Sequence, residues 1–414
     1  MSLRAKLITG VAAIVVVIAA VVTFAVTSGG SDGDQGGART LTWWSPNWDK
    51  DEAAKLVAAF EQENPGITVT VVETTWDTMA DKIRVALESG TGPDVITELT
   101  SRTGLYAGKG QLLDVSSWFT GDMARDDFLP SALDAVSLGG KTYGVPFRWD
   151  GSALIYNKDM LAAAGFTAPP TTWAQFTTIA KATTKNGVSG TAWPLGNDAN
   201  TVTRWIDQYF TDGGAFTVDG STVKVDPGKA ADALNLIGSS VTEGWASKSS
   251  LEVDNTGLRD LFINKKIAMY VGGAFDVTPI QQAGINLGTA LYPGTDGPGT
   301  VSADGFSFLV PAKTKKADDT RKFVQFLARP QNMAALTQTF PARTSAGTDT
   351  KFSTELIKPF FDQLAHARPN PGYTGMTDLT ATVYSAQQQV ALGRIGAAAA
   401  GQQIADQAAK VLKP

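Results

Sequence analysis

The feature that most limits the fold is an alternation, from Thr40 onward, of short apolar runs with amphipathic segments. The run "LTWW" predicts a first strand, and the segment after it places Ala53, Leu56, Val57 and Phe60 on one face of a helix. The run "ITVTVV" predicts a second strand, and "GPDVITEL" predicts a third β–α step. Strands that alternate with helices indicate a mainly parallel sheet flanked by helices, which is an α/β fold.

Size and composition narrow the possibilities further. A chain of 414 residues with 43% hydrophobic residues is larger than most single domains, which predicts two. The net charge is −5 and Lys and Arg are not clustered, so nucleic acid is not an expected partner. Cysteine is absent and His366 is the one histidine, read as an ordinary surface residue. This excludes disulfides, Cys nucleophiles and multi-His zinc sites, so neither a metal nor a cofactor is expected.

The amino terminus predicts export. Arg4 and Lys6 precede an uncharged apolar run from Leu7 to Val26, so residues 1–27 are expected to be a signal peptide or a membrane anchor. The run is longer than a usual signal-peptide core and no clear A-x-A site follows it, so cleavage and retention both stay open. Residues 28–39 are Gly-rich and predict a flexible linker with a reach of about 20 Å. The body is therefore expected outside the cytoplasmic membrane.

The loop after the first strand is rich in tryptophan. Trp43 lies inside the strand and is expected in the core, whereas Trp44 could face either way. Trp48 lies where the strand joins the helix, a position at which open α/β sheets bind ligands, although a hydrophobic staple is its structural alternative. Asp49 stands three residues before Glu52, which predicts a helix cap, with a ligand contact as the alternative.

Aromatic residues recur at other predicted loop positions. A sugar presents apolar C–H faces and polar rims, so a sugar site needs flat aromatic platforms beside carboxylates, amides and arginines. The sequence supplies both kinds of group, although use in the core explains many aromatic residues equally well. The aromatic residues concerned are Trp76, Trp149, Trp193, Trp205, Trp245 and Phe275.

Several segments carry a resemblance to a known family. The stretch "YGVPFRWDGSALIYNKDMLAAAGFTAPPTTWAQF" resembles the signature of the extracellular solute-binding proteins of sugar ABC transporters, the maltose-binding-protein-like family 1. "LVAAFEQENPGITVTVV", "GTGPDVITELTSRTGLYAGKGQLLDV", "FINKKIAMYVGGAFD", "DGFSFLVPAKTKKADDTRKFVQFLARPQN", "FPARTSA" and "QQQVALGR" are similar to other family segments in the same order. The resemblance thus covers nearly the whole chain after the linker.

The resemblance implies a two-lobed periplasmic-binding-protein type II fold. Each lobe is then a mainly parallel sheet flanked by helices, and the ligand cleft lies at the hinge between the lobes. Placed by motif, the N-lobe comprises residues 40–147 and about 305–339, and the C-lobe comprises 152–285 and 340–414. The hinge crossovers fall at 148–151, about 286–304 and 339–343.

The resemblance also implies binding positions. The loop "ELTSR" after the third strand gives Glu98, Ser101 and Arg102, "RWDGS" gives Asp150, and the strand ending "MYVGGAF" gives Phe275, where family members more often have tryptophan. The other positions in the predicted substrate site are Trp44, Trp48, Asp49, Trp76, Arg148, Trp149, Trp205, Gly273, Asp304, Gly305 and Arg343.

Some of these positions have a structural alternative. Glu98 and Arg102 are four residues apart, so an ion pair across a helix turn explains them equally well. Arg148 and Arg343 are equally explained by structural ion pairs at the hinge.

The resemblance implies a monomeric, non-enzymatic receptor at the outer face of the cytoplasmic membrane. This receptor is expected to capture a sugar of disaccharide or oligosaccharide size and to deliver it to ABC transporter permease subunits. The chain has no Walker-type glycine loop, so ATP hydrolysis belongs to a partner. The lipid-modified cysteine usual in family members of single-membrane bacteria is missing. Two alternatives stay open: a binder of an anionic solute such as a uronate or a phosphorylated polyol, and a secreted glycoside hydrolase without identified catalytic residues.

Overall fold

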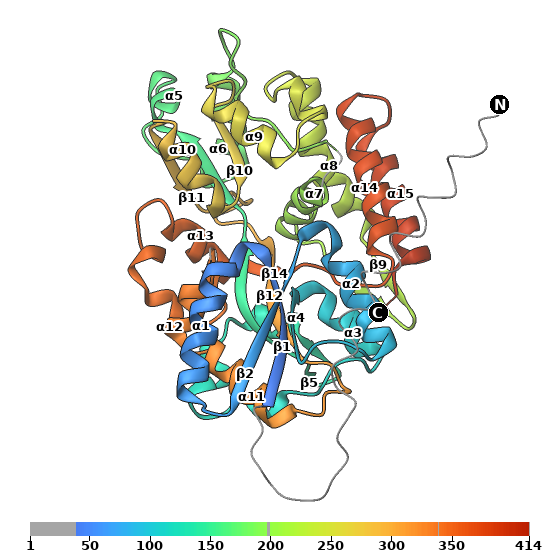
Figure 1. Ribbon diagram of the computed structural model, residues 1–414. Coiled ribbons are helices and arrows are strands. Elements are labelled where there is room, and N and C mark those ends of the chain that lie inside the picture. Colours follow the sequence, from blue (N-terminus) through green and yellow to red (C-terminus); the bar gives the residue numbers. More distant parts are fainter. Residues whose placement is uncertain (1–38, 197–198, 338, 414) are drawn as a thin grey trace, which may run out of the picture. The chain divides into compact units, whose positions relative to one another are not determined.

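The computed structural model describes residues 39–196, 199–337 and 339–413, which belong to one compact unit (Figure 1). The predicted signal or anchor, and the predicted linker up to Ala38, lie outside the described residues. Among the helices that are described, none is long and apolar enough to cross a membrane.

A seven-stranded sheet forms one half of this unit. Its strand order is β13-β6-β12-β3-β1-β2, and β14 pairs with β12. β1 is parallel to β2 and β3, as the sequence predicts, whereas β12 is antiparallel to β3 and β6. The strands are β1 (Arg39–Pro46), β2 (Ile67–Thr74), β3 (Val95–Leu99), β6 (Gly144–Gly151), β12 (Val301–Leu309), β13 (Phe340–Pro341) and β14 (Ala367–Pro369).

Helices cover this sheet and bury its apolar side chains. Trp43 of β1 is fully buried, packs edge-on against Phe308 and Phe323, and donates from its indole N–H to Thr97 Oγ1 at 2.9 Å. The core role predicted for Trp43 is therefore confirmed. The helices of this half are α1 (Lys50–Glu63), α2 (Trp76–Ser89), α3 (Thr103–Gly108), α4 (Pro130–Ala135), α11 (Ala317–Leu327) and α12 (Pro330–Leu336), with the hairpin β4 (Ser137–Leu138) and β5 (Lys141–Thr142).

A smaller sheet of order β10-β7-β11 forms the centre of the other half. Its strands are β7 (Ala153–Asn157), β10 (Met269–Gly272) and β11 (Leu287–Ala290). Both pairings are antiparallel, so the expectation of a mainly parallel sheet is wrong for this half. The cause is that β7 is central and both neighbouring strands return against it. The surrounding helices are α5 (Lys158–Ala163), α6 (Trp173–Thr183), α9 (Asn255–Ile263), α10 (Val277–Gln282) and α13 (Lys358–Gln363).

A group of four helices extends this second half, and α14 and α15 lie side by side against α8 (Figure 1). Trp205 of α7 is fully buried in their shared core and stacks on Tyr209 with ring centroids 5.1 Å apart. The helices are α7 (Ala199–Thr211), α8 (Pro227–Thr242), α14 (Met376–Ala391) and α15 (Ala397–Val411), and the hairpin β8 (Thr217–Asp219) and β9 (Thr222–Lys224) adjoins them.

The two sheets are joined by strands that run on from one into the other. β6 ends at Gly151 and β7 begins at Ala153, so Ser152 is the one residue between them. β12 brings the chain back beside β6, with Ala303 opposite Gly151 and Asp304 opposite Asp150. The predicted crossover at 148–151 thus coincides with the end of β6, while the exact lobe boundaries stay a prediction.

Candidate functional site

A cavity of about 810 Å³ lies where the carboxyl end of β1 and strands β6 and β12 meet the segment after β10. Both halves of the unit contribute to its wall, since β1, β6 and β12 belong to the large sheet and β10 to the small one. The lining residues are Trp48, Arg148, Asp150, Ala274, Phe275, Thr278, Phe306, Thr337, Thr339, Phe340, Lys351, Phe352 and Ile357. This wall combines aromatic rings with a few polar groups, the composition typical of small-molecule sites.

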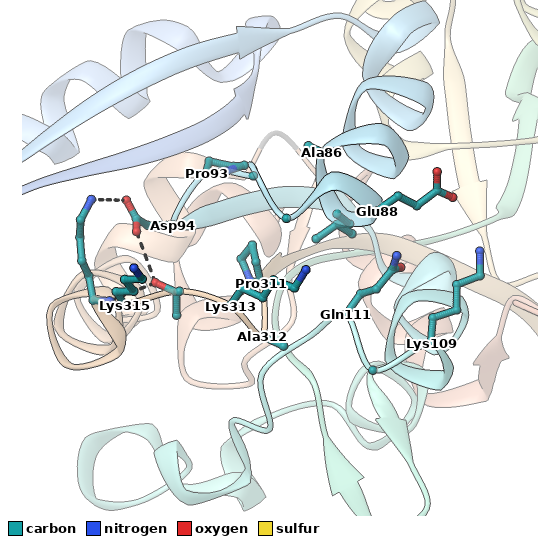
Figure 2. A pocket seen from close by; sticks show the side chains of 16 residues that line it. Ala86, Glu88, Pro93, Asp94, Lys109, Gln111, Pro311, Ala312, Lys313 and Lys315 are labelled. Carbon is teal, nitrogen blue, oxygen red and sulfur yellow. Dashed lines mark hydrogen bonds and ion pairs between the residues drawn. The ribbon is translucent and has the colours of Figure 1, made fainter.

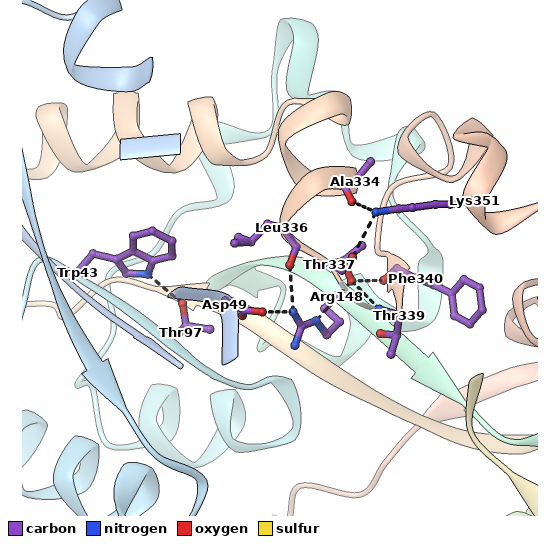
Figure 3. A network of polar contacts seen from close by, with 10 residues as sticks. All are labelled: Trp43, Asp49, Thr97, Arg148, Ala334, Leu336, Thr337, Thr339, Phe340 and Lys351. Atoms are coloured by element: carbon purple, nitrogen blue, oxygen red, sulfur yellow. Dashed lines mark hydrogen bonds and ion pairs between the residues drawn. The ribbon is translucent and has the colours of Figure 1, made fainter. Parts of the chain in front are cut away.

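A buried ion pair forms one side of the cavity (Figure 3). Arg148 Nη2 donates to Asp49 Oδ1 at 2.6 Å and to the carbonyl of Leu336 at 3.1 Å, and its Nε donates to Thr337 Oγ1 at 3.3 Å. Burial raises the pKa of Asp49, and the attraction of Arg148 opposes that rise. The pair fixes the direction of the guanidinium and ties β6 to the first loop.

The helix cap predicted for Asp49 is wrong. Asp49 occupies the N-cap position of α1, but its side chain makes no capping hydrogen bond. Its carboxylate turns toward Arg148, because a buried guanidinium would otherwise lack a counter-charge. Glu52, the other half of the predicted capping box, accepts from Lys55 instead.

Two aromatic rings of the large sheet face the cavity. Trp48 lies in the 3₁₀ turn Asn47–Asp49 and is half-buried. Its ring packs edge-on against Phe306 of β12, with centroids 5.8 Å apart, and the Arg148 guanidinium lies 5.4 Å from the same Phe306 ring. The position predicted for Trp48, at the mouth of a cavity next to the strand end, agrees with this placement.

Two carboxylates lie opposite each other on β6 and β12. Asp150 lines the cavity, whereas Asp304 Oδ1 accepts from the backbone N–H of Ser101 at 3.1 Å and of Gly305 at 2.8 Å. Burial raises the pKa of Asp150 to about 7, and the nearby charge of Asp304 adds to the rise. Burial also raises the pKa of Asp304. Asp150 is therefore the acid of this pair that is available to a ligand.

Phe275 supplies an aromatic surface from the small sheet. It follows β10 in the 3₁₀ turn Ala274–Asp276 and is 51% exposed, which is unusual for a large apolar side chain. A Cβ at Gly273 would lie 2.2 Å from the Phe275 ring, so this ring position requires glycine there. The next residue, Asp276, is buried and accepts from the Tyr270 hydroxyl at 3.0 Å. Burial raises its pKa to about 6.

No motif in the sequence indicates that the segment around Lys351 lines the cavity. Lys351 Nζ donates to the carbonyls of Ala334 and Thr337 (Figure 3). It also lies 4.8 Å from the centroid of the Phe352 ring. Burial lowers the pKa of Lys351. These contacts explain the lysine as a partner for the last carbonyls of α12. Phe340, Phe352, Thr337 and Thr339 were likewise not predicted, and no local motif distinguishes them.

The predicted arginines do not converge. Glu98 is fully buried and accepts from Arg102 at 3.0 Å, so the ion pair across a helix turn is confirmed. Arg343 bonds Asp127 at 2.7 Å and lies outside the cavity. Arg148 is paired with Asp49, so each of the three guanidinium groups is paired with a different carboxylate.

Several other predicted residues lie away from the cavity. Trp149 and Trp205 are fully buried, and Trp149 donates to Ser131 Oγ at 3.1 Å. Trp44 lies on the α2 side of β1, with Lys82 Nζ 4.4 Å above its ring. Gly305 allows close packing of strands, because a Cβ there would lie 1.9 Å from the Arg148 carbonyl oxygen. Trp76 is the first residue of α2, and its side chain lies outside the described part.

A second recess of about 480 Å³ has a different character (Figure 2). It lies at the amino end of β3, and Lys109, Lys313, Lys315 and Lys316 are among the residues that line it. Lys316 pairs with Asp94 at 3.1 Å. The recess carries no aromatic side chain and is at the opposite end of the strand from the predicted ligand loop. Over the described residues, no cluster of His, Cys, Asp and Glu is suited to a metal ion.

Known proteins resemble this chain along most of its length. Residues 48–334 match the family model "Bacterial extracellular solute-binding protein". A maltooligosaccharide ABC transporter solute-binding lipoprotein of Streptococcus pneumoniae is 26% identical over 371 residues, which is 84% of this chain and 82% of that protein. A galactooligosaccharide-binding protein of Bacillus subtilis is 24% identical over 386 residues, 90% of this chain and 88% of that protein.

A solved structure resembles the chain in fold. The sugar-binding protein MalE of Xanthomonas citri superposes with a TM-score of 0.80 at 22% identity, covering 90% of this chain and 96% of that one. This likeness confirms the two-lobed α/β fold that the sequence predicts, with the large sheet in one lobe and the small sheet in the other.

Proposed function

The chain belongs to the bacterial extracellular solute-binding proteins, and on that premise we propose that it captures a carbohydrate of two or more sugar units in the cavity between its lobes. The observation that carries this proposal is the pair of aromatic walls from different lobes. Trp48 and Phe306 belong to the large-sheet side, and Phe275 projects from the small-sheet side. Rings on opposite walls suit the apolar faces of a sugar.

The polar groups of the cavity support the same ligand class. Asp150 can accept hydrogen bonds from sugar hydroxyls, and the Thr339 hydroxyl can both donate and accept. The names of the relatives, which refer to maltooligosaccharide and galactooligosaccharide, support an oligosaccharide. The relatives' ligands differ from each other, so the proposal names the class of ligand and not its linkage.

Binding is proposed to close the cleft. A sugar that touches Phe275 and Trp48 together can make all its contacts only when the lobes approach, so it favours the closed arrangement. To take closure from rare to dominant, the ligand must prefer the closed form by about 5 kcal/mol. A few stacked rings and hydrogen bonds to a carboxylate supply an energy of that order.

The alternatives receive less support. An anionic solute would need an available cluster of guanidinium groups, but Arg102, Arg148 and Arg343 are each paired with a carboxylate. A glycoside hydrolase would need an acid and a base facing each other across the bound sugar. Asp49 is held by Arg148, and Asp150 is the single acid among the described residues that line the cavity.

Membership of this family also supports a proposal for the partners of the protein and for where it acts. We propose that the closed, loaded form delivers its sugar to ABC transporter permease subunits, as the name of the Streptococcus relative suggests. The protein is proposed to act as a monomer at the outer face of the cytoplasmic membrane. Lipoprotein relatives support an exported, membrane-attached site of action.

Calorimetric titration with a panel of neutral di- to hexasaccharides tests the proposal, with galacturonate oligomers and glycerol phosphate as anionic comparisons. We expect at least one neutral saccharide to bind with release of heat, and Phe275→Ala to weaken that binding. Binding of the anionic compounds alone, or hydrolysis of the bound saccharide, would contradict it.

A further inference from the structure

Helix α7 carries a buried polar face beside the two strands that connect the lobes. Asp207 and Gln208 lie three and four residues after Arg204, and Thr211 lies four and three residues after them, so all four are on one side of the helix. Arg204 and Asp207 are almost fully buried. A pair of charges is costly to bury, so its placement at this junction, and not at the surface of α7, needs an explanation.

The polar face of α7 hydrogen-bonds to both of these strands. Arg204 Nη1 donates to Asp207 Oδ2 at 2.9 Å and to the hydroxyl of Ser152, the residue between the two sheets. Asp207 Oδ1 accepts from the backbone N–H of Ser302 at 2.8 Å and from its hydroxyl at 2.7 Å. One turn later, Thr211 Oγ1 donates to the carbonyl of Thr300 at 2.7 Å. A helix of the small-sheet lobe therefore holds the first and the second crossover at once.

The same two strands are held by the large-sheet lobe only a few residues away. On β12, Asp304 accepts from the backbone of Ser101, which lies in the turn after β3. On β6, Trp149 donates to Ser131 of α4, and Arg148 binds Asp49. Within a few residues along each of these two strands, the contacts with the small-sheet lobe end and the contacts with the large-sheet lobe begin.

Only a few residues of each strand lie between the contacts with one lobe and the contacts with the other. On β12 this is Ala303 alone, between Ser302 and Asp304, and on β6 these are Asp150 and Gly151. Ala303 and Gly151 are direct register partners. Two of the smallest residues thus face each other between the two sets of contacts, and on this stretch of β12 the Ala303 carbonyl accepts from the backbone N–H of Asn370, which follows β14, at 2.7 Å.

We infer that the Arg204–Asp207 pair locks the first two of the three predicted crossovers to the small-sheet lobe and so confines the bending of these two strands during closure to the short stretch around the Gly151–Ala303 pair. This inference rests on the proposed function, because it assigns a place to the closure that the function requires. Arg204 and Asp207 are positioning residues, since they lie outside the cavity and act through Ser152 and Ser302. A short pivot leaves few residues to be ordered on closure, which keeps the conformational cost of binding low.

Loosening the lock has a defined consequence. If Ser152 and Ser302 are released, the rotation spreads over a longer stretch of each crossover, and the unliganded protein samples a wider range of lobe separations. Closure must then order more backbone, so affinity falls although no residue of the cavity has changed.

The absence of cysteine from the chain allows the lobe separation to be measured directly. Asp51→Cys at the start of α1 and Gln282→Cys at the end of α10 are exposed positions in different lobes for a pair of fluorescent labels. Single-molecule energy transfer on the labelled full chain gives the distance distribution without and with a saccharide that binds. The test variants are Asp207→Asn, which removes the charge, and Ser302→Ala, which removes one hydroxyl and is the milder change.

We expect both test variants to broaden the distribution in the unliganded protein and to raise the Kd, by about tenfold for Asp207→Asn and by less for Ser302→Ala. Asp94→Asn is the matched control, because Asp94 also bonds a backbone N–H, a hydroxyl and a cation, but at the far end of the large-sheet lobe. It should lower stability and leave distance and Kd unchanged.

The outcomes separate the inference from the function on which it rests. If no saccharide changes the distance in the unaltered chain, closure itself is refuted. If the unaltered chain closes and Asp207→Asn and Ser302→Ala close from the same narrow distribution with the same Kd, the lock is refuted. An equal effect of Asp94→Asn would also refute it, because the loss would then follow general destabilisation.

Discussion

Removal of the Asp49 charge tests the ion pair on which the candidate site is built. The Arg148 and Asp49 side chains are 7% and 1% exposed, and their closest atoms are 2.6 Å apart. Asp49→Asn keeps an oxygen that can accept from Arg148, but it removes the negative charge beside the buried guanidinium, whose other acceptors, the Leu336 carbonyl and the Thr337 hydroxyl, are neutral. Removal of one member of a buried pair costs about 3–5 kcal/mol, and we expect a loss of unfolding free energy of that order.

Urea unfolding followed by tryptophan fluorescence measures this loss, provided that the m-value is unchanged. The exposed pair Lys55–Glu52 on the same helix is the control, and Glu52→Gln should cost at most about 0.5 kcal/mol. The double variant Asp49→Asn with Arg148→Met should be more stable than Asp49→Asn alone, because it no longer buries an unpaired charge. A loss below about 1 kcal/mol for Asp49→Asn would refute the reasoning.

Three further substitutions separate binding from stability. Phe275→Ala should weaken saccharide binding by about 1–2 kcal/mol in calorimetry and change the unfolding free energy by less than about 0.5 kcal/mol, because the ring is half exposed. Trp205→Ala should do the reverse, with a loss of about 3–5 kcal/mol in urea unfolding, because its ring is fully buried. Gly305→Ala should prevent soluble expression or lower the melting temperature strongly, because its Cβ would meet the Arg148 carbonyl at 1.9 Å; a variant as stable as the parent would contradict the strand packing.

The order of the first strands and helices of the large-sheet lobe was predictable because the sequence signal for each of them is local. An apolar run, a helical spacing of apolar residues and a Pro-Gly stop lie within a few positions of each other, and β1, α1, β2 and β3 formed where those signals stood. The same local logic placed Trp48 at a strand end. It also identified the Glu98–Arg102 pair, since four residues on a helical turn bring two side chains together.

The rest of the site depends on contacts between distant parts of the chain. Asp49 and Arg148 are 99 positions apart, so the local capping pattern was the only visible signal and it was misleading. Trp149 and Trp205 were predicted as sugar platforms because tryptophan suits both a core and a platform, and only the folded chain shows them fully buried. Lys351 reaches the cavity through a turn that carries no motif.

The pH dependence of binding tests the role proposed for Asp150. Burial raises the pKa of this carboxyl from 3.8 to about 7, so the folded protein holds the proton more tightly than the unfolded chain does. This group's contribution to the unfolding free energy therefore falls as the pH rises from about 4 to about 7. A sugar hydroxyl that donates to Asp150 favours the ionised form, and binding should have the opposite trend, being strongest above pH 7.

Below that pH the protonated acid can accept only through its neutral carbonyl oxygen, which is a weaker acceptor than the carboxylate. For a sugar that binds the ionised form alone, the Kd rises about tenfold per pH unit and reaches about a hundredfold at pH 5. Asp276 also has a raised pKa, of about 6, and lies next to Phe275, so it could add to such a trend. Calorimetry of Asp150→Asn separates the two groups, because the variant should bind more weakly at pH 8 and lose most of the pH dependence. If the unaltered protein binds its saccharide equally well at pH 5 and pH 8, the sugar does not bind the ionised Asp150, and this acid has to be removed from the site.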